Sequence, residues 1–140
     1  MPEPRILLFV LLAALAPAVF AQAMEPGEWE FNSVLSGPSL PKPQTATITQ
    51  CISKEDASDP TRFTSGEQTM GCTVQPGART ADSYQWSLSC PDKGVSGDGK
   101  VRFTRRTIEA EIRTTVAMED RKVEMLSRVS GRLLGPCKTK

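Results

Sequence analysis

The residues of this chain that could do chemistry gather between positions 49 and 63, in the stretch TQCISKEDASDPTRF. Its carboxyl groups, from Glu55, Asp56 and Asp59, are of the kind that bind calcium. A calcium loop, however, needs acidic residues at alternating positions around a central glycine, and this spacing does not supply them. Ser53 followed by Asp56 instead matches a helix capping box, with Asp in place of the usual Glu or Gln. We therefore interpret the cluster as a helix cap and expect no metal there.

The same stretch continues with a second helix-start pattern, because Asp59 precedes Pro60 and proline is favoured at the first position of a helix. Three apolar residues on one side, Ile52, Ala57 and Phe63, are then expected to face the body of the domain. Capping thus accounts for the polar residues of this stretch.

Cysteine is the other reactive residue type, at Cys51, Cys72, Cys90 and Cys137. Their spacing contains no C-x-x-C pair and the chain has no histidine, so a zinc site is not expected. In a small secreted domain such cysteines form disulfides, and two are expected here. With no histidine and no free thiol, we expect neither nucleophilic catalysis nor a cofactor, and the chain is not interpreted as an enzyme.

The N-terminus predicts the compartment. A short basic start at residues 1–5 precedes an apolar run over residues 6–20, and Ala21-Gln22-Ala23 is a cleavage pattern. Residues 1–23 are therefore interpreted as a secretory signal peptide, because the apolar run is too short to span a membrane. We expect the mature chain, residues 24–140, to be a single disulfide-linked domain of the periplasm that neither spans the membrane nor binds nucleic acid.

Apolar and polar residues alternate along the mature sequence with a period of two, which predicts strands. The clearest run is 107–119, where Ile108, Ala110, Ile112 and Val116 share one face. We expect an all-β fold with one short helix: an antiparallel meander of about seven or eight strands, forming a curved sheet or a small barrel.

Facing apolar residues predict how neighbouring strands align. A two-residue loop at 120–121 would set Met118 opposite Val123 and Ile108 opposite Leu133. A loop at 105–106 would pair Phe103 with Ile108.

The segment CPDKGV predicts a further turn, with proline first and glycine last. Closing it sets Trp86 opposite Gly99, so that the large ring lies over a bare backbone. The hairpin before it sets Cys72 opposite Cys90, at the short separation that a disulfide needs. The predicted disulfides are therefore Cys72–Cys90 and, by elimination, Cys51–Cys137.

Two strands are predicted before the helix, over about 28–36 and 44–52, joined by the proline-rich connector GPSLPKP. In the second strand Ile48 and Cys51 fall on opposite faces. This parity predicts either a bulge or a strand that ends before the cysteine.

Charge is unevenly divided, since the net charge of +1 combines an acidic first half of the mature chain with a basic second half. A basic half can indicate an anionic partner such as lipid headgroups. Arg102, Arg113, Arg128 and Arg132, however, each stand between apolar neighbours at period two. We therefore favour alternating charges on a solvated face of the sheet.

Several short motifs carry a family resemblance: Pro26-Gly27-Glu28-Trp29-Glu30, Thr49-Gln50-Cys51-Ile52, Gly71-Cys72, Trp86 with Cys90, Gly97-Asp98-Gly99, and Gly131-Arg132 before Gly135-Pro136-Cys137. In this order and spacing the chain resembles domain-of-unknown-function family 3617, small secreted proteins of Gram-negative bacteria. The resemblance implies an extracytoplasmic β domain with disulfides and implies no activity. The resemblance also implies, for many relatives, a connector rich in methionine and proline after the first strand. Here the connector is SGPSLPKPQ and has no methionine, which argues against a copper-binding thioether loop.

The function predicted from these features is a non-catalytic binding module for an apolar or amphiphilic ligand. Trp29, Trp86 and Met125 are the candidate ligand-lining residues, because they lie on the apolar side of their strands. The alternative is a protein–protein interaction or structural accessory protein of the cell envelope, which would use an outer face or an edge strand.

Overall fold

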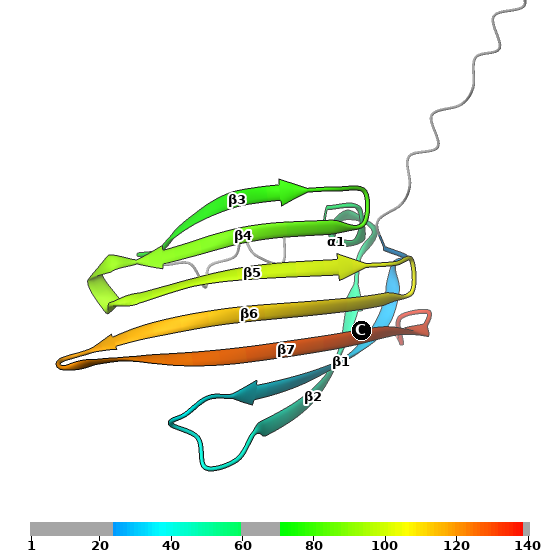
Figure 1. The fold of residues 1–140 in the computed structure, drawn as a ribbon. Helices are drawn as coiled ribbons and strands as arrows, with labels where there is room; N and C mark the ends of the chain where they lie inside the picture. Colours follow the sequence, from blue (N-terminus) through cyan, green and yellow to red (C-terminus); the bar gives the residue numbers. More distant parts are fainter. Residues whose placement is uncertain (1–23, 60–70, 139–140) are drawn as a thin grey trace, which may run out of the picture.

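The computed structural model describes residues 24–59 and 71–138. Within them, seven antiparallel strands form one sheet in the order β2-β1-β7-β6-β5-β4-β3 (Figure 1). The expected all-β class with one short helix is confirmed, and the sheet is open, since β2 and β3 remain at its edges. The elements are β1 (Gly27–Ser36), β2 (Gln44–Ile52), α1 (Lys54–Ser58), β3 (Thr73–Arg79), β4 (Ser83–Cys90), β5 (Val95–Phe103), β6 (Thr107–Met118) and β7 (Arg121–Gly135).

Both predicted disulfides are present. Cys72 and Cys90 join the start of β3 to the end of β4, and Cys51 and Cys137 join the end of β2 to the segment after β7. The second bond acts across the N-terminal hairpin, because β1 lies between β2 and β7 in the sheet. The first and last parts of the chain are thus held together both by a strand pair and by a covalent link.

The register of the middle strands follows the prediction. Trp86 lies opposite Gly99 in the β4–β5 pair, and Phe103 lies opposite Ile108 in the β5–β6 pair. The turn between β4 and β5 is a short 3-10 segment, Pro91–Lys93, that ends at Gly94 with a φ of +62°. Glycine adopts this left-handed conformation without a steric penalty, which explains the proline-first, glycine-last pattern.

The register predicted for β6 and β7 is wrong by two residues. The loop is Glu119–Asp120, so that Val116 lies opposite Val123 and Ile108 opposite Gly131. A shift of two residues keeps every side chain on its own face, and the apolar pattern therefore could not exclude it. Gly131 supplies the physical reason: a Cβ there would lie 2.5 Å from Cγ2 of Ile108 and 2.7 Å from Cδ1 of Phe31.

The predicted interruption of the second strand is also wrong. β2 pairs with β1 without a register shift from Gln44 to Ile52, and the irregularity lies instead in the β1–β7 pair, between Glu28 and Trp29. Cys51 is exposed because it lies on the face opposite Ile52, so its disulfide forms outside the core. The positions of Ile48 and Cys51 on opposite faces of β2 therefore require no bulge, because a disulfide cysteine can lie on the polar face of a sheet.

Ser53 is the N-cap of α1, as predicted. The hydroxyl of Ser53 accepts a hydrogen bond from the backbone N–H of Asp56 at 3.2 Å, and it donates to the Asp56 carboxylate at 2.9 Å. Asp59 is the C-cap of this helix. The second predicted turn, from Pro60, and the expected position of Phe63 lie outside the described residues.

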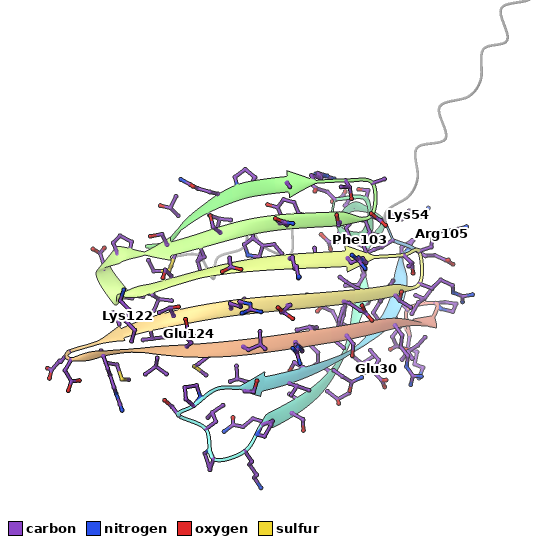
Figure 2. The ribbon with its side chains drawn as sticks, viewed as in Figure 1. Glu30, Lys54, Phe103, Arg105, Lys122 and Glu124 are labelled. Carbon is purple, nitrogen blue, oxygen red and sulfur yellow. A yellow bond between two sulfur atoms is a disulfide. The ribbon has the colours of Figure 1, made fainter. Side chains whose placement is uncertain are left out.

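The core lies at one end of the sheet, where β5 turns into β6 and where α1 covers the apolar face (Figures 1 and 2). Figure 2 labels Phe103 and Lys54 at this end and Lys122 and Glu124 toward the opposite end. The buried cluster consists of Met24, Trp29, Ile52, Ala57, Tyr84, Val101, Phe103 and Ile108. A single helix of five residues can bury only part of a sheet this long.

Candidate functional site

The apolar face of the sheet continues past the core as a row of half-buried side chains. Trp86 on β4, Ile112 on β6 and Leu35 on β1 lie in this row, with Gly99 and Ser127 between them. The next row carries Leu88, Gly97, Thr114 and Met125 in the same manner. Large apolar groups are therefore separated by short residues on this half of the face, which we call the distal apolar face.

The structure separates the three ligand-lining candidates. Trp29 is 0% exposed, and its indole N–H donates to the carbonyl of Glu25 at 3.0 Å, so it belongs to the core. Trp86 is half-buried against that core and stacks on Tyr84, with 5.6 Å between the ring centroids. Trp86 and Met125 share the distal apolar face, on β4 and β7 respectively, with β5 and β6 between them.

A small hollow lies beside Met125. Its volume is about 220 Å³, and it is lined by Ser36, Gly37, Pro38, Arg113, Thr114, Thr115, Glu124, Met125 and Leu126. Thr114 and Met125 contribute from the apolar face, while Arg113 and Glu124 bring charges from the other side of their strands. Pockets for drug-sized ligands are larger, so this hollow fits a narrow group.

A larger hollow, of about 610 Å³, lies on the opposite, polar face. The polar side chains that line it are Asn32, Ser83, Gln85, Lys100, Arg102, Glu109, Glu111, Arg128 and Ser130. The sequence predicted alternating charges on a solvated face, but not that this face forms a hollow. Charged residues recur on this face of β5, β6 and β7 and are visible in the sequence, but the alternation of residues does not reveal that the face is hollowed.

Ion pairs lie on this polar face, both within β6 and between neighbouring strands. Glu111 accepts hydrogen bonds from Arg113 at 3.1 Å and from Arg128 at 3.4 Å, and Arg132 contacts Glu30 at 3.0 Å. The Arg113 hydrogen bond lowers the pKa of Glu111 from its ordinary value, against the desolvation of the carboxyl, and Arg128 and Lys100 add to the lowering. Carboxylates on this face are thus paired with neighbouring cations, as expected for a solvated sheet face.

The described part of the chain holds no group of three or more His, Cys, Asp and Glu side chains that could bind a metal. The cysteines within it, all of those in the chain, are consumed in disulfides. The carboxylate of Asp56 serves α1, as its hydrogen bonds with Ser53 show. Among residues 24–59 and 71–138, no helix is long and apolar enough to cross a membrane.

These observations define a small protein built from a single open antiparallel sheet, fastened by two disulfides and apolar over most of one face. Residues 24–137 match the family described as protein of unknown function DUF3617, and the chain belongs to that family. No curated protein and no solved structure matches the chain.

Proposed function

We propose that the protein is a non-catalytic binding module of the periplasm, and that it takes an apolar or amphiphilic ligand on the distal apolar face. One observation carries the proposal: the sheet presents half-buried Trp86, Ile112 and Met125 beyond the end that α1 covers. Burying apolar area is favourable by about 25 cal/mol per Å², so a ligand chain laid along these residues would gain affinity.

The hollow beside Met125 supports an amphiphilic ligand in particular. Its lining combines the apolar Met125 and Leu126 with the charged Arg113 and Glu124, so an apolar chain and a polar head group would both find partners there. An acyl chain is narrow enough for a volume of about 220 Å³, whereas a bulky ring system is not.

Export from the cytoplasm is part of the same proposal. Disulfides persist in oxidising compartments, and two of them hold this fold. The family match begins at residue 24, directly after the predicted signal cleavage site. N-terminal sequencing of the protein isolated from a periplasmic extract should therefore begin at Met24.

Fluorescence titration tests the ligand proposal. A fluorescent fatty acid such as cis-parinaric acid should brighten when it binds, and an unlabelled long-chain fatty acid should displace it. Met125→Lys places a charge on the distal apolar face and should weaken probe binding by about tenfold or more. Leu134→Lys is the matched control, since Leu134 is an apolar residue of the same strand that is already 45% exposed and does not line the hollow. Equal binding by both variants would place the ligand elsewhere.

The alternative function, protein–protein interaction in the cell envelope, is favoured by a different feature, the uncovered edge strand β2. A partner protein recovered in place of a small molecule would support this alternative.

A further inference from the structure

The two edges of the sheet are built differently. At one edge, β3 contains Pro76 and Gly77, its register with β4 shifts between Pro76 and Arg79, and Arg79 adds a charge. Proline, charge and irregular pairing are the devices by which proteins prevent an edge strand from pairing with another chain. The β3 edge is therefore protected.

The opposite edge has none of these protections within the strand. β2 is nine residues long, pairs with β1 through an unbroken register, and is exposed along its length except at Ile52. It contains no charged residue and no proline, and it is rich in the β-branched residues that favour strands. Lys42 and Lys54 lie outside it, beyond its two ends. An edge strand that is neutral and has an unbroken register presents unpaired backbone groups to another strand.

β2 is also held in place before any partner arrives. The Cys51–Cys137 disulfide holds the C-terminal end of the strand, and the hydroxyl of Thr47 donates to the side-chain carbonyl of Asn32 on β1 at 2.6 Å. A fixed edge loses little conformational entropy when a second strand pairs with it. Ile48, at the centre of the strand, is 57% exposed, which is high for a large apolar side chain.

We propose that two copies of the protein pair through β2, antiparallel and about a two-fold axis, to form one continuous sheet. In a two-fold interface, β2 of one copy pairs with β2 of the other. Charged residues of one sign on β2 would therefore repel one another, and β2 has no charged residue. On the polar face, Thr45, Thr47 and Thr49 meet the same row of the second copy, an arrangement that threonine pairs stabilise. The protected β3 edges then lie at the two ends, which makes the assembly a closed dimer.

Light scattering on the oxidised chain, over a range of concentrations, tests this inference. The expected mass is that of a dimer, which dissociates on dilution. Ile48 lies near the two-fold axis, so Ile48→Lys sets like charges together and should weaken the dimer about fivefold to tenfold. Met118→Lys is the matched control, because Met118 is 54% exposed and lies in the β6–β7 hairpin, away from β2.

A charge-complementation experiment separates lost pairing from lost folding. At a protein concentration near the wild-type Kd, Ile48→Lys and Ile48→Glu should each be largely monomeric alone, and an equal mixture of the two should recover the dimer. A monomeric wild-type chain, a dimer equally insensitive to both lysine variants, or a mixture that stays monomeric would overturn the inference, and so would an assembly larger than a dimer.

Discussion

Trp86 lies over Gly99 on the neighbouring strand, and its ring occupies the space that a side chain at position 99 would fill. A Cβ there would stand 2.5 Å from Cε2 and 2.7 Å from Cη2 of the indole, closer than carbon atoms approach without displacement. The glycine therefore sets the position of the ring, and through it the β4 side of the distal apolar face.

Gly99→Val should lower stability by about 1 to 3 kcal/mol, because the new side chain must displace the ring or bend β5. Thermal unfolding should show a lower Tm, and tryptophan fluorescence should shift. Ser96→Val, on the exposed opposite face of β5, should be nearly neutral. If Gly99→Val instead stabilised the protein, the close packing of Trp86 on β5 would be incorrect.

The two disulfides should differ in their effect on stability. Loop-closure entropy gives about 4 to 5 kcal/mol for Cys51–Cys137, with a sequence separation of 86, and about 3 kcal/mol for Cys72–Cys90, with a separation of 18. Replacing the first pair by alanine should therefore reduce the free energy of unfolding in urea more than replacing the second pair. The reverse order would mean that the N-terminal hairpin stays attached to β7 without its covalent link.

Ser53→Ala should destabilise the protein by about 1 kcal/mol, because it removes the cap from the backbone N–H of Asp56. Asp56→Ala should also reduce stability, and neither change should alter the binding of calcium or zinc in calorimetry. Micromolar metal binding that either variant abolished would contradict the capping role.

The pKa of Glu111 should lie below its ordinary value and should rise toward it in Arg113→Gln, because the Arg113 hydrogen bond is the main cause of the lowering. A lowered pKa means that the stabilisation by this carboxylate is present above the ordinary pKa and is lost as pH falls through the folded-state pKa. The effect on stability should be small, since the ion pair is exposed. NMR titration of the Glu111 side chain measures the shift, and an unchanged pKa in the variant would rule out this cause.

The sequence predicted the β4–β5 register because Pro91, Gly94 and Gly99 mark the turn and the contact under Trp86. It did not predict the β6–β7 register, since the apolar pattern repeats every two residues and Gly131 was the only landmark. The alternation of faces along each strand was enough to place Trp86 and Met125 on the same face, because a register error of two residues does not change the face of a side chain.

Other parts of the site depend on tertiary contacts that no local pattern reveals. Met24 is 1% exposed in the core, although a lone apolar residue beside a predicted cleavage site gives no sign of burial. Gly37 and Pro38 line the hollow at Met125, but a proline-rich connector does not predict where it packs. The burial of Trp29 likewise depends on α1 and on the N-terminal residues that cover it.

Native mass spectrometry of the protein purified from its own periplasm tests the ligand proposal most directly. The expected result is an additional mass, a small apolar or amphiphilic molecule, retained by the wild-type chain and by Leu134→Lys and lost from Met125→Lys. A wild-type chain that carries no additional mass, and that also acquires none after incubation with a lipid extract, would contradict the proposal that the distal apolar face binds a ligand.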